Sequence, residues 1–553
     1  MMATVKVPVL IVGGGPVGLC TSLLCSYHGI PSLLVEQHPG PSRYPKARFI
    51  NARTMEIFRQ IGIEPAMREV AVPHARNVAW APSLVGEEIV RRPIETMIPE
   101  SVREWSPTSG CTSSQEIFEP VLLAQAQRRE LAQIHFSTEL LGFEQGEEQL
   151  VAQLLDRPSG NGWEVQAQYL IGADGAHSRV REVLGIAMHG RSVLAHYITI
   201  PFRADLSRWV GDRELNLCVI TNPDAAGVLL YDGGERWRFT AFYSPDNGER
   251  PEDYTPARCL DLVRTAIGAP AVPVALDGIF AWSDAALVAE RFGDHRAFLV
   301  GDAEHLMSPA GGFGMNVGIQ DAHNLAWKLA AALKGWAGEA LLASYEAERA
   351  PVSRTITDQT TRNMTAVRGT SRDGGDAAPP RSAARPPLGR PEFYREHGLV
   401  LGATYASAVI VPDGTAPVAV SNPVTDYVPN ARPGSRAPHV WLDRAGERIS
   451  TLDVFDSGFV LLAGPRGGAW CEAAEAVARE LHIPLTAYAV GVRGGLTDPA
   501  GEWAQRYEVE PGGTVLVRPD GYVAWRSARG VAAPGSVLHE VLQIVSGKRK
   551  ADE

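Results

Sequence analysis

The sequence predicts an α/β fold, in which a Rossmann-like nucleotide-binding domain carries an inserted antiparallel sheet and is followed by a compact C-terminal unit. Three observations predict this fold. A β-branched run, a glycine-rich turn and a helical segment follow one another at the N-terminus. Residues 187–286 are rich in strand-like alternation, and apolar runs recur beyond about residue 430. A chain of 553 residues exceeds what a single hydrophobic core usually serves, so several domains are expected.

The N-terminal elements are predicted from short apolar runs. Val7–Val12 is β-branched and bounded by glycines, which is typical of a buried parallel strand. Leu19–Tyr27 is predicted as a helix and Ser32–Val35 as a second strand, so the three segments form a βαβ unit. Tyr169–Ile171 and Ala297–Val300 are further short apolar runs that lead into Gly and Asp, and they are predicted as strands.

The later segments change from strand-like to helical and then to mixed patterns. Trp237–Phe242 alternates as an antiparallel strand does. From Ile319 the apolar residues recur every three or four positions, which predicts an amphipathic helix. Arg368–Pro387 is rich in Gly, Pro, Ser, Ala and Arg and is predicted as a linker or mobile loop. The C-terminal unit has apolar runs at Phe459–Leu462 and Thr514–Val517, with a helix between them.

Charge and cysteine content exclude several classes of protein. The formal net charge is −11, and the one dense basic run, Lys548–Lys550, is predicted as a solvated tail, so no nucleic-acid partner is expected. The six cysteines form no CxxC pair and no cluster at metal-ligand spacing, so no metal is expected and a reducing cytoplasm is the expected location. Val7–Tyr27 lacks charged residues, but Gly13–Pro16 would break a membrane-spanning helix, and no membrane partner is expected.

A glycine motif follows the first predicted strand and opens the first helix. Its three glycines allow a tight turn, the close approach of a pyrophosphate and the packing of helix on strand, while the helix N-terminus offers free N–H groups. Glu36 ends the second strand, where its carboxylate can accept hydrogen bonds from an adenosine ribose. A dinucleotide site is predicted; the alternative is a glycine-rich turn that binds nothing. The candidate contacts are Gly13, Gly15, Pro16, Val17, Gly18, Glu36 and Gln37.

Two later motifs indicate which dinucleotide is bound. Gly172–Arg181, which reads GADGAHSRVR, resembles the DGxxSxxR signature of the para-hydroxybenzoate hydroxylase-like flavoprotein hydroxylases. Gly301–His305, followed by Pro309–Asn316, is similar to the GD motif of the same family. The similarity continues through Asp321, Asn324, Trp327 and Lys328. This resemblance implies that the cofactor is FAD and that the α/β domain is an FAD-binding domain.

The resemblance also implies which residues contact FAD. Asp302, at the end of a strand, can accept hydrogen bonds from the ribityl hydroxyls, and the neighbouring glycines let the backbone pass close beneath a flat ring. The helix starting near Met315 points N–H groups at the pyrimidine end of the flavin, where the reduced ring is negatively charged. Asp174 is implied to act in NAD(P)H use as well as in FAD support. The candidate contacts are Asp174, Asp302, Pro309, Gly312, Gly314, Met315 and Asn316.

Two more candidate contacts lie between the first two motifs. The segment Arg43–Glu56 is similar to the family's PRAxxxNxRTME segment, with Lys46 where an arginine is common. This similarity implies that Arg48 approaches FAD, where a cation suits a pyrophosphate or a reduced flavin. Gln115 matches a glutamine that contacts the flavin chain. A purely structural role is the alternative for both residues.

No catalytic residue is assigned from the sequence, although Arg48, His305 and Pro309 are candidates. Pro309 resembles the proline that borders the reactive edge of the flavin. Histidine titrates near neutrality, but His305 has no partner visible in the sequence, so a packing or orienting role is expected. Glu304 departs from the common alanine and places a carboxylate either near the flavin or at the surface.

The C-terminal unit resembles the thioredoxin-like domain of phenol hydroxylase-type and aromatic polyketide hydroxylases. The matching pieces are Pro438–Leu442, Ser450–Asp453 and Val517–Arg526. Cys471 is the only cysteine there, so redox activity is not expected. A packing or dimer-supporting role is expected instead. The predicted domains are an FAD-binding domain at 1–186 and 287–365, a substrate-binding sheet domain at 187–286, a linker at 366–430 and a thioredoxin-like domain at 431–545.

The resemblance implies an FAD-dependent monooxygenase that takes electrons from transiently bound NADPH or NADH. It would insert one oxygen atom from O2 into an aromatic substrate, of polycyclic polyketide type, through a C4a-hydroperoxyflavin. Baeyer–Villiger oxygenation and hydroxylation of a simple phenol remain alternatives within the class. An alternative of another class is a flavin-binding or nicotinamide-sensing protein without catalysis. The oligomeric state is expected to be a monomer or a homodimer.

Overall fold

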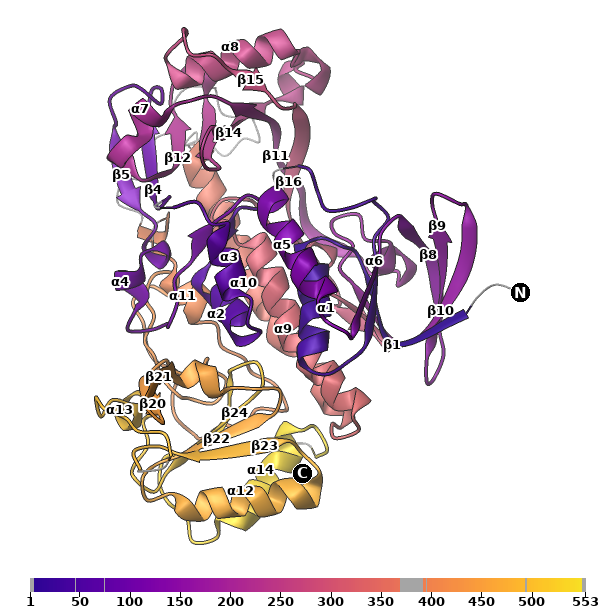
Figure 1. Ribbon diagram of the computed structural model, residues 1–553, viewed down its shortest axis with the longest axis vertical. Coiled ribbons are helices and arrows are strands. Elements are labelled where there is room, and N and C mark those ends of the chain that lie inside the picture. The colour runs from indigo at the N-terminus through magenta and orange to yellow at the C-terminus, as the bar shows by residue number, and fades with distance from the viewer. Residues whose placement is uncertain are drawn as a thin grey trace.

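The protein consists of three sheet-containing parts that follow one another along its long axis (Figure 1). The computed structural model describes residues 4–44, 46–73, 75–368, 391–393, 395–492 and 495–549. A large antiparallel sheet lies at the top of this view, a parallel sheet with its helices in the middle, and the C-terminal part, in orange and yellow, at the bottom. Except for Arg368, the predicted linker or mobile loop Arg368–Pro387 lies outside the described residues.

The first sheet is the parallel sheet that the N-terminal βαβ pattern predicts. Its strand order is β17-β18-β10-β1-β2-β7, and the neighbours from β18 to β7 run parallel. β8 and β9 extend this sheet as an antiparallel hairpin on β10. The strands are β1 (Thr4–Val12), β2 (Ser32–Val35), β7 (Ala132–His135), β8 (Thr138–Gln145), β9 (Leu150–Asp156), β10 (Asn161–Gly172), β17 (Gly293–Asp294) and β18 (Ala297–Leu299).

The first helix of this part, α1, is strongly buried. It begins at Pro16, three residues before the predicted start, because the fixed φ angle of proline suits the first position of a helix. α1 packs against α5 and α9, and the apolar residues of all three belong to one core. The helices of this part are α1 (Pro16–Tyr27), α2 (Ala52–Gln60), α3 (Glu64–Glu69), α4 (Pro99–Val102), α5 (Gln115–Gln127), α6 (Arg179–Val183), α9 (Gly314–Leu333) and α10 (Glu339–Arg368).

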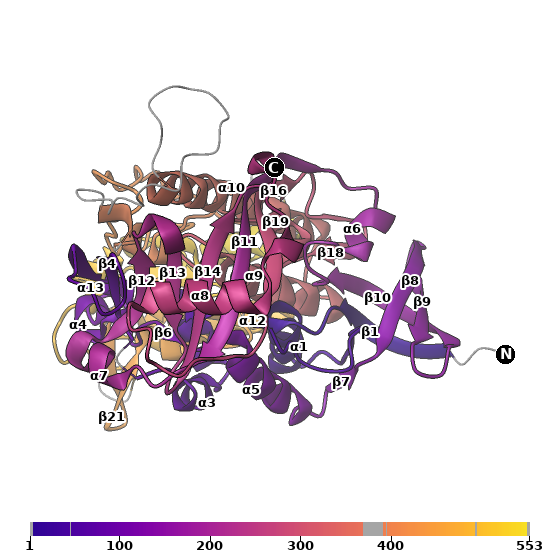
Figure 2. The same cartoon turned by 90° about the horizontal axis from the view of Figure 1, so that it is seen from above.

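The second sheet is the predicted antiparallel sheet, with the order β19-β16-β11-β14-β13-β12-β4-β5 and β15 at β11. Figure 2 shows α8 (Pro256–Ile267) lying across one face of this sheet, where its apolar side chains complete a separate core. α10 packs against β16 from the first part of the molecule. The strands are β4 (Asn77–Ala81), β5 (Val90–Pro93), β11 (Met188–Arg203), β12 (Leu215–Ile220), β13 (Gly227–Tyr231), β14 (Arg236–Tyr243), β15 (Ala275–Leu276), β16 (Phe280–Ala289) and β19 (His305–Leu306).

This sheet takes strands from outside the stretch 187–286 that the sequence predicts for it. β4 and β5 come from residues 77–93, and β19 comes from the loop of the predicted GD motif. β4 pairs in parallel with β12, and its buried residues join the cores of the sheet. β5 pairs with the neighbouring β4, but β4 joins the sheet through β12, far away in the chain, and β19 has only two residues. The local pattern therefore does not assign these strands to this sheet.

The C-terminal part is an α/β unit with a four-stranded sheet in the order β23-β22-β24-β25. β22 runs parallel to β23 and antiparallel to β24, and α12 packs against α14. The preceding stretch is not a free linker along its whole length, because the apolar side chains of Tyr405, Val409 and Ile410 are buried. The elements include α11 (His397–Leu401), β20 (Trp441–Arg444), β21 (Glu447–Ser450), β22 (Phe459–Ala463), α12 (Gly468–Leu481), β23 (Leu485–Ala489), α13 (Trp503–Tyr507), β24 (Thr514–Val517), β25 (Val523–Ser527) and α14 (Pro534–Val545).

Among the described residues, no helix combines the length and the apolar character that crossing a lipid bilayer requires.

Candidate active site

The glycine motif forms a tight turn whose backbone lies against the second motif. Gly13 has a φ of +111°, and a Cβ atom there would lie 2.3 Å from the carbonyl oxygen of Ala173. A Cβ atom on Gly18 would lie 1.9 Å from the carbonyl oxygen of Gly13. At Gly15, by contrast, no protein atom lies within 4 Å of that position. Gly15 therefore borders open space, as a backbone that accommodates a pyrophosphate must.

A cavity of about 1110 Å³ opens at this turn. Of the residues that the sequence predicts, the cavity wall includes Gly13, Gly15, Glu36, Gln37, Gln115 and Asp174. Residues outside the predicted set of cofactor contacts also contribute, among them Gly14, His38, Ser42, Lys46, Glu119, Leu141 and Arg179. Pro16, Val17, Gly18, Arg48, Asp302, Pro309, Gly312, Gly314, Met315 and Asn316 do not line this cavity.

Glu36 stands at the end of β2, as the βαβ pattern predicts. Its carboxylate accepts hydrogen bonds from the backbone N–H of Gly14 at 2.6 Å and of His38 at 2.9 Å. These bonds hold the carboxylate beside the glycine turn at the wall of the cavity. This position suits a group that accepts hydrogen bonds from a ribose.

Close packing of two glycines against Val17 brings the first and third motifs together. Val17 of α1 lies between Gly301 and Gly318, where added Cβ atoms would stand 3.1 and 2.7 Å from its methyl groups. The second motif is tied to the third by Arg181, which donates to the carbonyl oxygens of Ala303 and Ala176 at 2.8 Å each. Val17 thus serves the packing of α1 on α9, which is a role beyond the cofactor contact that the sequence predicts.

Asp174 caps a short helix at the cavity wall. Its carboxylate accepts hydrogen bonds from the hydroxyl of Ser178 at 2.5 Å and from the backbone N–H of Val180 at 3.0 Å. Burial raises the pKa of Asp174, although these hydrogen bonds favour the charged form. The residue therefore orders the loop that closes this side of the cavity.

Gln115 and Glu119 form the opposite wall on α5. Gln115 accepts a hydrogen bond from the backbone N–H of Ala47 at 3.1 Å and donates to Glu119 at 2.6 Å. Glu119 in turn accepts from the backbone N–H of Ser42 at 2.7 Å. Burial raises the pKa of Glu119 against these hydrogen bonds. Its position one helical turn after Gln115 is the signal that could have identified it from the sequence.

Lys46 and Arg48 have opposite environments although only one residue separates them. Lys46 lines the cavity. The guanidinium of Arg48 is buried and directed at the second sheet, where it pairs with Asp232 at 3.2 Å and donates to Asn216 and to the carbonyl oxygen of Tyr231. Burial lowers the pKa of Arg48 to about 10, although Asp232 opposes this shift. Of these two cations, Lys46 is therefore the one at the cavity, and Arg48 links two parts of the molecule.

The loop of the third motif leads into α9. The Asp302 carboxylate is accessible but deep in the fold, and its Oδ1 would lie 3.9 Å from a Cβ atom on Gly314 at the start of that helix. Burial raises the pKa of Asp302, while His305 and Lys46 lower it. Met315 lies on the first turn of α9. Asp302 and the free N–H groups of this turn thus face the same region, as a flavin contact at this point requires.

Asn316 fixes this loop to the segment before α2. Its Oδ1 accepts from the backbone N–H of Asn51 at 2.9 Å, and its Nδ2 donates to the carbonyl oxygens of Phe49 and Gly312 at 2.8 and 2.7 Å. Gly312 has a φ of +68°, and a Cβ atom there would lie 2.9 Å from that of Phe49. Gly312 and Asn316 therefore set the shape of the loop, whereas Pro309 beside it is exposed.

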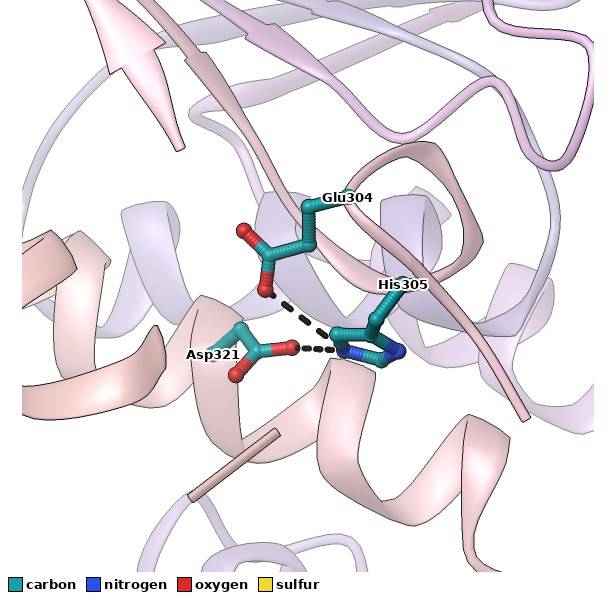
Figure 3. Close-up of side chains that lie close together, drawn as sticks. All are labelled: Glu304, His305 and Asp321. Carbon is teal, nitrogen blue, oxygen red and sulfur yellow. Dashed lines mark hydrogen bonds and ion pairs between the residues drawn. The ribbon is translucent and has the colours of Figure 1, made fainter. Parts of the chain in front are cut away.

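His305 lies in a fully buried cluster with Glu304 and Asp321 (Figure 3). The ring Nε2 of His305 is 2.8 Å from Asp321 Oδ2 and 3.5 Å from Glu304 Oε1. Burial, followed by the charge of Asp321, raises the pKa of Glu304 well above its usual value. Burial raises the pKa of Asp321, but Arg349, at 2.6 Å, and His305 together outweigh burial and lower this pKa to about 2. The raised pKa favours the neutral form of Glu304, and its burial excludes the surface position that the sequence leaves open.

This cluster also has the spacing of metal ligands, since one ligand atom from each side chain lies within 4.8 Å of the others. Arg349 already neutralises Asp321, and the Tyr345 hydroxyl lies 3.0 Å from Glu304 Oε2. We interpret the cluster as three side chains that share protons with one another. His305 has Asp321 as the partner that the sequence does not reveal, and this contact gives the histidine an orienting role.

An aromatic cluster lies on the second sheet beside the loop Pro309–Asn316, which is named the flavin loop below. Tyr197 of β11 stacks on Trp282 of β16 with ring centroids 4.2 Å apart, and Phe242 of β14 lies 5.1 Å from Tyr197. Met364 of α10 and Ala310 of the flavin loop complete the cluster. All three rings lie within the stretch 187–286 that the sequence predicts as a substrate-binding sheet domain.

Comparisons with known proteins agree with this geometry. Residues 6–360 match the FAD binding domain family, and residues 430–548 match the family described as aromatic-ring hydroxylase, C-terminal. The fit to FAD is supported by the structure itself, because Gly15 and Glu36 border a large cavity that approaches the N-terminus of α1.

The chain is 38% identical to tetracenomycin A2 monooxygenase-dioxygenase of Streptomyces glaucescens, over 95% of this chain and 94% of the relative. It is also 38% identical to aklavinone 12-hydroxylase of Streptomyces purpurascens, over 98% and 99% of the two chains. Among solved structures, the flavin-dependent monooxygenase PieE with FAD and substrate is 36% identical, with a TM-score of 0.91 over 99% and 100% of the chains. Aklavinone-11 hydroxylase with FAD and aklavinone is 36% identical, with a TM-score of 0.86 over the same shares. The chain therefore belongs to the family of FAD-dependent aromatic-ring hydroxylases and is a flavin-dependent monooxygenase.

Proposed function

We propose that this enzyme hydroxylates a polycyclic aromatic substrate of polyketide type, with O2 as the oxygen source and NADPH or NADH as the reductant. The aromatic cluster of Tyr197, Phe242 and Trp282 carries this proposal. It offers a flat apolar wall beside the flavin loop, and flat fused rings pack well against aromatic side chains. Relatives that act on aklavinone and on tetracenomycins by name support the same substrate class.

The reaction consumes one molecule each of ArH, O2, NAD(P)H and H⁺, and yields ArOH, NAD(P)⁺ and H2O. When bound, FAD supplies the redox chemistry, since it carries electrons from NAD(P)H to O2 and transfers one oxygen atom to the ring. The chain binds and orients the reactants. Glu36 accepts hydrogen bonds from the adenosine ribose, Asp302 accepts from the ribityl chain, and Lys46 offsets negative charge on the cofactor.

The start of α9 stabilises the reduced cofactor electrostatically. Its free N–H groups and the positive end of the helix dipole face the region of Asp302. A preorganised dipole favours the negative charge of a reduced flavin more strongly than water does, because it does not need to reorient. The raised pKa of Glu304 favours its neutral form, so this side chain adds no second negative charge near Asp302.

Two alternative reactions share this cofactor site. Hydroxylation of a simple phenol is supported by 33% identity to 2,4-dichlorophenol 6-monooxygenase of Delftia acidovorans, over 98% of each chain. Baeyer–Villiger oxygenation of a polycyclic ketone also adds one oxygen atom. The aromatic cluster favours a polycyclic substrate over a simple phenol, but it does not distinguish hydroxylation from Baeyer–Villiger oxygenation.

A substrate panel tests the proposal. Purified enzyme with FAD is offered tetracyclic phenols, anthraquinones and simple phenols, while NAD(P)H consumption, H2O2 release and product mass are measured. We expect a product heavier by one oxygen atom from a polycyclic phenol, with little H2O2, and NMR to show an intact ring system. A lactone product supports the Baeyer–Villiger alternative, and efficient turnover of simple phenols alone contradicts the polycyclic proposal.

Two tryptophan variants locate the substrate wall. Trp282→Ala removes a stacked ring of the cluster, so the KM for a polycyclic substrate rises while that for a simple phenol changes less. Trp163→Ala removes a partly buried tryptophan from β10 in the first sheet and serves as the control. Equal changes in the two variants would contradict the placement of the substrate at this wall.

A further inference from the structure

A tight turn of the C-terminal part is buried between helices of the FAD-binding part. This turn, Arg518–Tyr522, connects β24 to β25 and is closed by hydrogen bonds between Arg518 and Tyr522 and between Gly521 and Arg518, at 2.8 and 2.9 Å. Turns between antiparallel strands normally lie on the surface. Here Arg518 has no exposed surface and Asp520 is 1% exposed.

The backbone of the turn is held by side chains of α2. Arg53 donates from Nη2 to the carbonyl oxygen of Asp520 at 2.8 Å, and its Nη1 pairs with Glu56 at 2.9 Å. Gln60 donates to the carbonyl oxygen of Pro519 at 2.9 Å. These bonds join both ends of α2 to the same turn.

The side chains of the turn continue into α9 and α10. Arg518 donates to both carboxylate oxygens of Glu348 at 2.7 and 2.8 Å, and it pairs with Asp520. Lys328 of α9 donates to Glu348 at 2.8 Å, and Asn324 donates to Asp520 at 3.3 Å. Two buried cations thus face two buried anions. Such a balanced array contributes little net stability, but it strongly disfavours any arrangement in which one partner is displaced.

The start of α2 is in turn fixed to the flavin loop. Asn51 caps α2 by accepting from the backbone N–H of Thr54 at 2.9 Å, and its own N–H donates to Asn316. Asn316 holds Gly312 and Phe49, as described above. Only one residue separates Asn51 from Arg53, so the turn is connected to the flavin loop through a rigid first turn of a helix.

We propose that the turn Arg518–Tyr522 is a positioning element for the flavin. Through this turn the C-terminal part sets the position of the flavin loop, Pro309–Asn316. Arg53 is the positioning residue that transmits this constraint. The C-terminal part therefore contributes to cofactor binding without contacting the cofactor. The inference depends on FAD binding and not on the identity of the aromatic substrate.

Two matched pairs of variants test this inference. Arg53→Gln removes the bond to the turn, and Arg59→Gln is its control, because Arg59 lies on the same helix and binds Asp453 of the C-terminal part at 2.7 and 2.9 Å. Gly521→Ala strains the buried turn at a φ of +78°, and Gly446→Ala places a similar strain, at +91°, in another turn of the same part with nothing within 4 Å.

The dissociation constant of FAD, the midpoint potential of the bound flavin and its visible circular dichroism are measured for each full-length variant. We expect Arg53→Gln and Gly521→Ala to weaken FAD binding roughly three- to thirtyfold and to change the dichroism, as mutations in coupled networks do. The two controls stay within about twofold of the wild type. Arg53→Lys, which keeps a cation beside Glu56, should restore part of the loss.

The inference is overturned if each test variant loses thermal stability like its control while FAD affinity and flavin spectra stay at wild-type values. It is also overturned if all four variants weaken FAD binding equally, because that pattern indicates general loosening between the parts. If Arg53→Gln does not fold, the Gly521→Ala and Gly446→Ala pair decides, since it changes no charge.

Discussion

Lys46 and Arg48 show how closely spaced cations acquire different roles. The resemblance in sequence directs attention to Arg48, yet its guanidinium is directed at Asp232 and the exposed Lys46 lines the cavity. The sequence could not decide between them, because the carboxylate that draws Arg48 away lies 184 residues further along the chain. The placement of Glu36 and of the glycine turn follows from the βαβ unit, whereas Gln115 is indicated only by the resemblance in sequence.

Lys46→Gln is expected to weaken FAD binding about fivefold, because an exposed ion pair contributes roughly 1 kcal/mol. The loss should shrink at high salt, since the Debye length falls to about 3 Å at 1 M and screens the wild-type lysine as well. Titration of the apoprotein with FAD at low and high salt measures both effects. Lys334→Gln, at a cation bound to the carbonyl oxygen of His28, is the control. A salt-independent loss would assign Lys46 a steric role.

Glu304→Gln is expected to remove a dependence of stability on pH. The folded state keeps Glu304 protonated, whereas the unfolded chain releases this proton above its usual pKa of 4.5. The stability of the wild type is therefore unaffected by Glu304 below pH 4.5 and falls as the pH rises toward the raised folded-state pKa, by up to about 1.4 kcal/mol per unit. Glutamine mimics the neutral acid, so the stability of the variant should increasingly exceed that of the wild type between pH 5 and pH 8.

Thermal unfolding at several pH values checks this expectation. Glu510→Gln serves as the control, because Glu510 is 59% exposed and pairs with an exposed Arg529. Its melting temperature should follow that of the wild type at each pH. Parallel curves for Glu304→Gln and the wild type would show instead that Glu304 is ionised in the folded enzyme.

At the scale of single elements, the N-terminus of α1 separates cofactor contact from packing. Gly15→Ala adds a methyl group where no protein atom lies within 4 Å, so apoprotein stability should stay unchanged while FAD binding weakens. Gly18→Ala places its methyl group 1.9 Å from the carbonyl oxygen of Gly13, so apoprotein stability should fall as well. Apoprotein melting temperatures and FAD titrations distinguish the two effects. Equal loss of apoprotein stability would show that Gly15 does not border the cofactor.

Element prediction succeeded where pattern and pairing are local. β1, α1 and β2 follow one another in the chain, and their apolar runs predict both their type and their order. β4 and β19 could not be assigned to their sheet, because β4 joins it through the distant β12 and β19 has only two residues. The hydrogen-bond partners of such strands are fixed by the tertiary fold, and alternation in five residues or fewer carries too little information.

At the scale of the whole molecule, the C-terminal part shares a hydrophobic core with the FAD-binding part. Trp327 of α9 and the following Trp336 are buried against Phe459 of β22, with ring centroids 5.9 and 6.0 Å from it. The resemblance in sequence predicts a thioredoxin-like domain with a packing role, but it does not reveal that a turn of this domain enters the FAD-binding part. Burial of that turn depends on ion pairs between residues 170 positions apart.

A shared core predicts that the two parts unfold together. Phe459→Ala leaves a cavity in this core and should cost about 3–5 kcal/mol, as buried Phe→Ala changes do. Because Trp327 belongs to the helix that begins at the flavin loop, flavin release and loss of helical circular dichroism should shift to lower temperature by the same several degrees. The Phe459→Ala variant is expected to keep nearly the FAD affinity of the wild type at low temperature. If Phe459→Ala instead produced an early dichroism transition while flavin release stayed at the wild-type temperature, the C-terminal part would be an independent folding unit.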